Sequence, residues 1–212
     1  MTQEPATGRW SRRKQTRPSE IIEAALDLFV ERGFAATKIE DIAKRAGVTR
    51  GTPYLYFASK EELFKAVIRE GLLPRIEVGE ALVRDFNGPA TALLEEVVRF
   101  SWQAIAKTKL AGIAKLVMAE AGNFPDVAKY YHDEVVHRGQ NLVMYTLEYG
   151  VKRGEFRPMD IDYTMRVVIA PIMMAMIWQH SLGVCINESI DDDRFLDSYL
   201  SLLKCGLCQR ID

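Results

Sequence analysis

Four consecutive residues in the first quarter of the chain could read the edges of DNA bases. Thr49, Arg50 and Thr52 supply hydroxyl and guanidinium groups, and Gly51 stands among them. An arginine can donate two parallel hydrogen bonds to guanine O6 and N7, and a threonine hydroxyl can bond several bases. Gly51 has no side chain, so the backbone can approach a partner closely there. We expect this segment to contact bases in the major groove of duplex DNA.

Other polar residues around this segment suit the phosphates better than the bases. Phosphate contacts fix the position of a protein on DNA without reading its sequence. Lys60 lies at the start of a predicted helix, and the N-terminus of a helix also favours an anion. The candidates for phosphate contact are Thr37, Lys38, Tyr54, Tyr56 and Lys60.

Short helices must position these side chains. Apolar residues at intervals of three and four form one face of a first helix, which ends at Gly33. They are Ile22, Ala25, Leu26 and Phe29. A second face follows a predicted capping box of Thr37 and Glu40 and ends at Gly47; it consists of Ile39, Ile42, Ala43 and Ala46.

The next helix is expected from Thr49 to Tyr56, after a connection of about two residues. Two short helices joined by a tight turn that contains glycine are typical of a helix-turn-helix. Ser59 and Glu62 form a second capping box, which opens a fourth helix. Pro53 fits the first turn of the third helix, where an N–H has no partner within the helix.

The block GVTRGTPYLYFASKEELF, residues 47–64, resembles the DNA-binding domain of the tetracycline-repressor (TetR) family. Pro53 departs from the family pattern, in which a larger aliphatic residue is common. The resemblance implies an operator in double-stranded DNA, a homodimer and a small-molecule effector. It also implies a C-terminal domain that binds the effector and forms the dimer.

The remainder of the chain predicts helices only. Breaks such as Asn87-Gly88-Pro89 separate helix-length segments at about 90–107, 110–121, 126–152, 160–186 and 192–209. We expect an all-α fold of about nine helices. Its parts are a flexible basic arm (1–17), a three-helix DNA-binding domain with its connecting helix (18–72) and an effector-binding and dimerisation domain (73–212).

Two apolar groups in the C-terminal part have candidate functions. From Val167 to Trp178 apolar residues surround the helix, so a partner subunit is expected to cover one side. The candidate dimer interface is Val168, Ile172, Phe195, Leu196, Tyr199, Leu200 and Leu203. The alternative is a central helix buried within one subunit.

The second group is rich in aromatic and methionine side chains, which suit a flat or aliphatic ligand. The candidate ligand-binding residues are Trp102, Met118, Phe124, Tyr131, Met174 and Trp178. Ordinary core packing is the alternative for each of them. Few charged residues flank these apolar runs, so a multiply charged ligand is not expected.

Composition narrows the class of protein. The net charge is −1, but residues 1–60 hold 11 basic and 7 acidic residues, a local balance of +4. A basic N-terminal part followed by an acidic remainder is expected if only the N-terminal part contacts DNA phosphates. No apolar segment predicts a leader or a membrane span, and three cysteines suit the reducing cytoplasm.

No catalytic or cofactor motif is apparent, so we expect neither an enzyme nor a bound cofactor or metal. Cys205 and Cys208 form a C-x-x-C, for which a thiol sensor is the alternative to a structural role. The main prediction is a dimeric repressor released by its effector. The alternatives are an activator, a regulator without an effector, and a helical enzyme or carrier.

Overall fold

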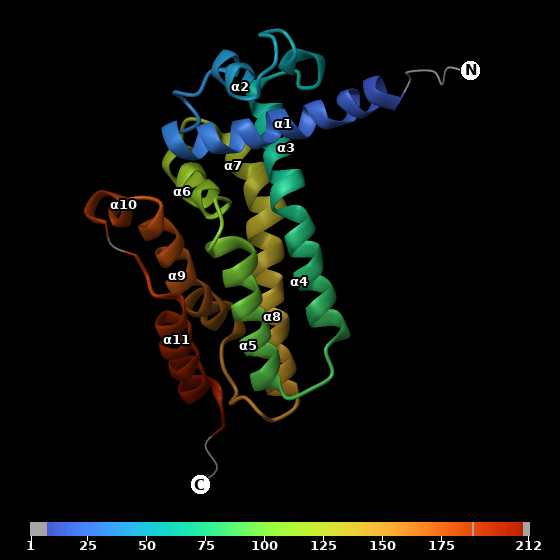
Figure 1. The fold of residues 1–212 in the computed structure, drawn as a ribbon. Coiled ribbons are helices and arrows are strands. Elements are labelled where there is room, and N and C mark those ends of the chain that lie inside the picture. The colour runs from blue at the N-terminus through green and yellow to red at the C-terminus, as the bar shows by residue number, and fades with distance from the viewer. Residues whose placement is uncertain (1–7, 188, 210–212) are drawn as a thin grey trace. The chain divides into compact units, whose positions relative to one another are not determined.

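The computed structural model describes residues 8–187 and 189–209, with side chains from residue 18 onward. Within these residues the chain is helical, apart from an isolated antiparallel bridge between Phe156 and Cys208. The all-α prediction is therefore confirmed (Figure 1). Contacts divide the chain between Arg69 and Glu70 into two compact units. The side chains of the basic arm predicted at 1–17 lie outside the described residues.

The first unit contains α1 (Gly8–Arg32), α2 (Ile39–Arg45), the 3₁₀ turn η1 (Pro53–Leu55) and most of α3 (Lys60–Gly71). Three buried aromatic rings hold these elements together. Phe29, Phe34 and Phe64 lie with their ring centroids 5.4 to 5.5 Å apart. Tilted and edge-to-face contacts at this separation are favourable for aromatic rings.

The helix ends in the first unit agree in part with the glycine and capping signals in the sequence. Gly33 and Gly47 adopt φ values of +85° and +67° after α1 and α2, a conformation that favours glycine. The Glu62 N–H donates to Ser59 Oγ at 3.2 Å, which confirms that Ser59 caps α3. The capping box predicted at Thr37 is wrong, because Lys38 is the residue before α2 and no side chain caps that helix.

The second unit begins with α4 (Leu73–Asp85) and α5 (Ala90–Ser101), which continues into the π-helical segment η2 (Trp102–Ala106). The next helices are α6 (Ala111–Glu120), α7 (Pro125–Tyr131), the π-helical η3 (His132–Val136) and α8 (His137–Lys152). The last are α9 (Ile161–Gln179), α10 (Leu182–Ile186) and α11 (Asp192–Leu207). Helix α8 packs against α4, α5 and α9, as Figure 1 shows.

The segment predicted as one helix over 160–186 is divided at His180 and Ser181. The Ser181 N–H bonds the carbonyl three residues back, at Trp178, and its hydroxyl bonds Ile177 O. A serine that returns a hydrogen bond to its own helix competes with the regular pattern of backbone bonds. Helix α9 therefore ends there, and α10 starts as a separate element.

The core of the second unit lies between α5, α8, α9 and α11. Trp102 is fully buried and its ring centroid lies 4.8 Å from that of Phe195. The Tyr199 hydroxyl donates to Val168 O, which fixes α11 against α9. Asp160 and Asp191 cap α9 and α11, each by accepting a backbone N–H three residues later.

Candidate DNA interface and ligand cavity

The segment expected to read bases is a series of turns and not a regular helix. Thr52 N–H bonds Thr49 O at 2.9 Å, and only Pro53–Leu55 form a single 3₁₀ turn. The predicted helix from Thr49 to Tyr56 is therefore wrong in its extent. Gly51 and Pro53 explain the difference, because glycine is a weak helix former and proline lacks the N–H that a helix requires.

Arg50 is the most accessible charged side chain of this segment. Its side chain is 79% exposed, and its Nη2 donates to Glu40 Oε1 of α2 at 2.8 Å. Thr49 is also exposed, and an added Cβ at Gly51 would meet no atom within 4 Å. Thr52 is buried, with its Oγ1 2.7 Å from Thr49 Oγ1. Thr49, Arg50 and the Gly51 backbone thus face solvent, whereas Thr52 supports the turn.

The carboxyl group of Glu40 is held in its ionised form. The N–H of its own backbone and then Arg50 bond the carboxylate, and both interactions lower the pKa of Glu40. A carboxylate at this place would repel DNA phosphates if it were unpaired. In its ion pair with Arg50, the negative charge of Glu40 is balanced by the guanidinium.

Two of the residues predicted to contact phosphates, Lys60 and Thr37, form hydrogen bonds within the protein. Lys60 Nζ donates to Phe34 O at 2.7 Å and to Thr37 O at 3.1 Å, and lies 4.5 Å from the centroid of the Phe34 ring. Thr37 is buried, and its hydroxyl lies within bonding distance of Gly33 O and Leu28 O. These bonds close the loop between α1 and α2. The exposed candidates that remain are Lys38, Tyr54 and Tyr56.

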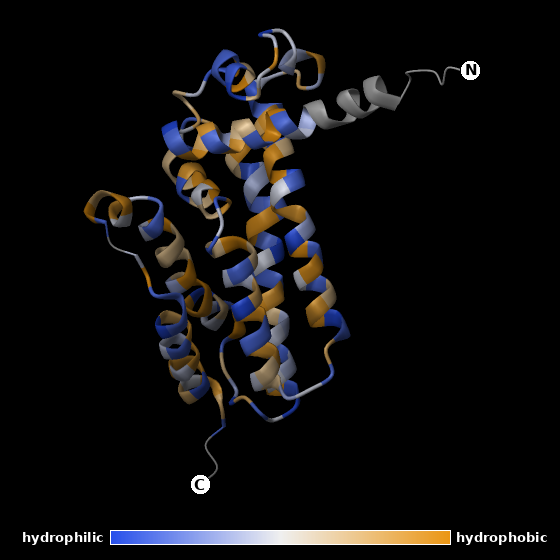
Figure 2. Ribbon diagram, viewed as in Figure 1, coloured by the Kyte–Doolittle hydropathy of each residue, from blue (hydrophilic) through white to orange (hydrophobic). Residues whose placement is uncertain are grey.

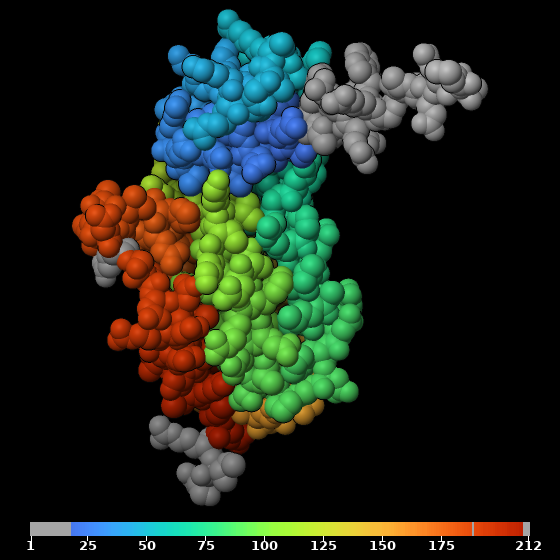
Figure 3. All heavy atoms as spheres, in the orientation of Figure 1, coloured from blue at the N-terminus to red at the C-terminus, as the bar shows by residue number. Residues whose placement is uncertain are grey.

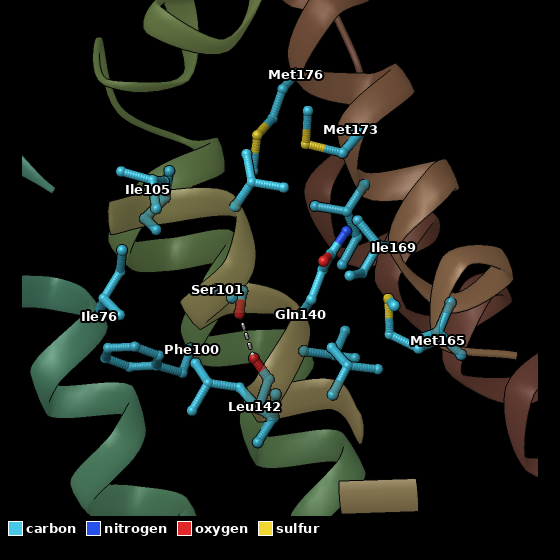
Figure 4. A pocket seen from close by; sticks show the side chains of 18 of the residues that line it. Ile76, Phe100, Ser101, Ile105, Gln140, Leu142, Met165, Ile169, Met173 and Met176 are labelled. Carbon is cyan, nitrogen blue, oxygen red and sulfur yellow. Dashed lines mark hydrogen bonds between the residues drawn. The ribbon is translucent and has the colours of Figure 1, made fainter. Parts of the chain in front are cut away.

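The second unit contains a cavity of about 380 Å³. Side chains of α4, α5, η2, α7, η3, α8 and α9 line it, and Figure 4 shows Ile76, Phe100, Ile105, Met165, Ile169 and Met173 around its interior. Small-molecule sites in proteins are mostly apolar cavities of about 300–1,000 Å³. The volume and the lining therefore both suit an apolar ligand.

Most of the predicted ligand residues lie elsewhere. Only Tyr131 lines the cavity. Trp102 belongs to the core, Met118 and Met174 are exposed by 64% and 61%, and Phe124 and Trp178 are partly buried outside the lining. The aromatic and methionine residues chosen from the sequence are therefore, apart from Tyr131, not the residues that form the cavity.

A few polar groups interrupt the apolar lining. Ser101 Oγ donates to Val97 O at 2.8 Å, and the Arg75 guanidinium bonds Gly71 O. Burial raises the pKa of Tyr131 to about 12, so its hydroxyl stays protonated at neutral pH. Gln140 and Arg166 complete the polar part of the lining. Of these residues, the sequence analysis named only Tyr131.

Spacing within α9 does not separate the cavity side from the outer side. The residues of α9 that line the cavity are Met165, Arg166, Val168, Ile169, Ala170, Ile172, Met173 and Met176. Gln140 and Ser101 carry no signal in the sequence either, because a single polar residue in a helix does not reveal which way it points.

The predicted dimer residues are mostly part of the core of their own subunit. Val168, Ile172, Leu196, Tyr199 and Leu200 are buried, and Phe195 and Leu203 pack against the same core. These residues therefore lie on the inner faces of α9 and α11, and the dimer interface stays a prediction. The large apolar side chains that α9, α10 and α11 expose are Tyr163, Val167, Met174, Leu182, Val184, Ile186 and Leu202. Figure 2 shows many hydrophobic residues along these helices, and Figure 3 shows the same segment, in orange to red, at the surface.

Helix α9 alone, among the described helices, is long and apolar enough to cross a membrane by length and composition. Its residues Val168 and Ile172 pack into the core described above. A core helix of a folded domain passes the same test of length and hydropathy.

Comparisons with known proteins agree with both units. The family described as bacterial regulatory proteins, tetR family, matches residues 21–67. The C-terminal domain of AefR-like transcriptional repressors matches residues 92–194. The transcriptional repressor KstR2 of Rhodococcus jostii is 30% identical over 198 residues, which are 92% of each chain. The fatty acid metabolism regulator protein of Bacillus subtilis is 26% identical over 197 residues, 92% of this chain and 98% of that one.

Solved structures have the same fold. The transcriptional regulator FadR of Bacillus subtilis, in complex with stearoyl-CoA, has a TM-score of 0.73 at 24% identity and covers 89% of this chain and 98% of its own. The ketosteroid transcriptional regulator KstR2 of Mycobacterium tuberculosis has a TM-score of 0.72 at 24% identity over 92% of this chain and 96% of its own. The KstR2 relative and the matches to both units show that the chain belongs to the TetR family of transcriptional regulators.

Proposed function

We propose that this DNA-binding transcriptional repressor binds a palindromic operator as a two-fold dimer and leaves it when an apolar effector fills the cavity of the second unit. The observation that carries the proposal is the cavity of about 380 Å³, whose wall includes the start of α4. Helix α4 follows α3 in the chain, and α3 packs Phe64 into the core of the DNA-binding unit. A ligand that moves α4 therefore acts on the chain segment that leads to that unit.

The operator contacts are proposed from exposure. Arg50 and Thr49 read base edges, the Gly51 backbone approaches the groove, and Lys38 with the exposed tyrosines contacts phosphates. Two such segments, related by a two-fold axis, require half-sites about 34–36 Å apart or a multiple of that distance.

The dimer surface is proposed on the outer sides of α9 and α11. Tyr163, Val167 and Met174 lie four and seven residues apart on α9, so they share one exposed face. Leu202 on α11 is 74% exposed. Contiguous exposed apolar surface of this kind is typical of a contact with another protein, and a two-fold dimer would cover the same face on both copies.

The effector is proposed to have a long or ring-fused apolar body. The names of two relatives mention molecules of this kind. FadR of Bacillus subtilis was solved in complex with stearoyl-CoA, and KstR2 is described as a ketosteroid transcriptional regulator. The lining also contains Arg75 and Arg166, but Arg75 bonds Gly71 O and Arg166 is exposed, so neither side chain requires an acidic group on the effector.

The coupling is proposed to act through the contact of α4 with α8. Arg138 donates to both carboxylate oxygens of Glu80, at 2.7 and 2.6 Å, and so holds α4 against α8. A ligand shifts the equilibrium only if it binds one arrangement of α4 better than the other. Coupling between sites in proteins is typically about 1–3 kcal/mol.

The experiment that tests the proposal combines DNA selection with ligand release. Selection of bound duplexes from a random pool should yield a palindrome, and fluorescence anisotropy on that duplex should show about 5- to 150-fold weaker binding when stearoyl-CoA or a ketosteroid saturates the protein. A compound that raises the melting temperature without changing operator affinity would contradict release by the effector. Selection of single half-sites would contradict the dimer.

A further inference from the structure

The cavity contains two neutral polar side chains that have no hydrogen-bond partner within the described part of the chain. They are Tyr131, at the end of α7, and Gln140, in α8. Tyr131 is only 9% exposed, Gln140 is half-buried, and Figure 4 shows the Gln140 amide ending among the α9 side chains near Ile169. Polar groups that face an apolar cavity normally find a partner, because an unmade hydrogen bond there is unfavourable.

The backbone between them is adapted to turn both side chains into the cavity. Residues nine apart in a regular α-helix point to roughly opposite sides, since each residue rotates by about 100°. The π-helical segment η3, His132–Val136, lies between Tyr131 and Gln140 and takes up one additional residue in its turn. The remaining rotation is roughly 80°, which allows Tyr131 and Gln140 to line the same cavity. Segments of this kind are rare and frequently occur at functional sites.

Their separation along the helix defines the spacing of what they bind. Nine residues at 1.5 Å per residue separate the two Cα atoms by roughly 13 Å along the helix, and helical side chains all lean toward the N-terminus, so the two donors do not converge on one oxygen atom. The protonated Tyr131 hydroxyl and the Gln140 amide are both donors to a carbonyl or hydroxyl oxygen. The cavity between them is lined by apolar side chains such as Val136, Val143 and Ile169.

We propose that the effector has an apolar body with an uncharged oxygen acceptor toward each end, one bonded by Tyr131 and the other by Gln140. This inference rests on the proposed function, in which the cavity is the effector site. It adds the positions and the chemical class of the polar groups that the effector must present. A plain hydrocarbon leaves both donors unpaired, and a ligand with a single carbonyl leaves one of them unpaired.

A rigid four-ring series tests the spacing without confounding changes in shape. The probes are androstane, the two androstanones with a carbonyl at one end or the other, and androstanedione with a carbonyl at both ends. Calorimetry on the full chain should rank the diketone first, each monoketone about 5-fold weaker and the hydrocarbon weaker again, as expected for one neutral hydrogen bond per step.

Conservative variants of Tyr131 and Gln140 show which of the two side chains bonds each carbonyl of the probe. Tyr131→Phe should reduce the affinity for the diketone about 5-fold and leave one monoketone unchanged, and Gln140→Leu should do the same for the other monoketone. Tyr145→Phe is the matched control, because Tyr145 lies on α8, is exposed and does not line the cavity. Retained helical circular dichroism in each variant shows that it folds.

The outcomes separate the two proposals. Equal binding of all four probes, unaffected by the variants, overturns the two-acceptor inference and leaves the cavity as the effector site. Failure of every probe to bind the wild-type chain contradicts both. A loss in the Tyr145→Phe control as large as that in Tyr131→Phe also overturns the inference.

Discussion

Arg50 and Glu40 form an ion pair at 2.8 Å that joins the first turn of α2 to the turn expected to read bases. The guanidinium is largely exposed, and only its Nη2 is bonded to the carboxylate. The remaining N–H groups are free to bond a guanine, because an arginine has five donors. The pair therefore orients Arg50 and cancels the charge that would otherwise bind any phosphate.

The first prediction concerns this pair. Glu40→Gln should leave Arg50 unpaired, so that it binds phosphates at any sequence. We expect the ratio of operator affinity to random-DNA affinity to fall by about 3- to 10-fold, mainly because random binding becomes stronger. Titrations of both duplexes at matched salt concentrations measure that ratio.

The control for this prediction is Asp41→Asn. Asp41 is also in the first turn of α2, but it pairs with Arg32 at 3.4 Å and not with Arg50. It changes the net charge of the turn by the same amount. Equal changes in the two variants would show that only total charge matters and that the Arg50–Glu40 contact has no part in specificity.

The second prediction separates Lys60 from Lys38. Lys60→Met removes the donor that holds the carbonyls of Phe34 and Thr37, so it should lower the free energy of unfolding by about 1–3 kcal/mol. The salt dependence of DNA binding should not change. Lys38→Met should do the opposite: its side chain is exposed, so stability should be retained and the salt slope should fall by about one unit.

Chemical denaturation and DNA titrations across salt concentrations measure these two quantities. If Lys60→Met reduced the salt slope at unchanged stability, Lys60 would contact a phosphate, as its position in the sequence suggested.

Much of the fold follows from local signals in the sequence. Helix α11 starts one residue after Asp191, which caps it, and α3 ends at Gly71, a residue type that weakens a helix. Apolar periodicity and capping residues act within a few neighbours, so they are readable from the chain itself. Thr37 was misread because its hydroxyl has nearer partners in Gly33 and Leu28 than the N–H groups of α2.

The functional faces were harder to predict because they depend on tertiary packing. Helix α9 is apolar on nearly every side, so periodicity cannot tell Ile172, which lines the cavity, from Val167, which is 67% exposed. Trp102 is a residue type that is common in ligand sites, yet its ring packs against Phe195 in the core. The cavity is formed by helices distant in sequence, and no single segment carries its pattern.

The third prediction concerns assembly. Val167→Glu together with Leu202→Glu places charges on the outer faces of α9 and α11, so the folded chain should sediment as a monomer and lose tight operator binding. Val78→Glu is the control, since Val78 is also exposed, by 56%, but lies on α4. Leu200 is only 3% exposed, so Leu200→Glu should unfold the second unit and not merely dissociate it. A double variant that stays dimeric at micromolar concentration would exclude this face.

The fourth prediction concerns the end of α8, where Gly150 lies directly against the ring of Phe156. A Cβ at Gly150 would overlap that ring, which is buried and cannot move outward. Its backbone is also fixed, because the Phe156 N–H bonds Gly150 O at 3.0 Å. Gly150→Ala should therefore lower the free energy of unfolding: overpacking costs about 1–3 kcal/mol, and the better helix propensity of alanine returns at most about 1 kcal/mol.

Gly206→Ala is the matched control for that substitution, because Gly206 is also helical but a Cβ there would meet no atom within 4 Å. Here the gain in helix propensity is unopposed, so the melting temperature should stay the same or rise. Thermal unfolding followed by circular dichroism measures both variants. If Gly150→Ala were as stable as Gly206→Ala, the Phe156 ring would have to move at little cost, and the close contact would not be a constraint on the sequence of α8.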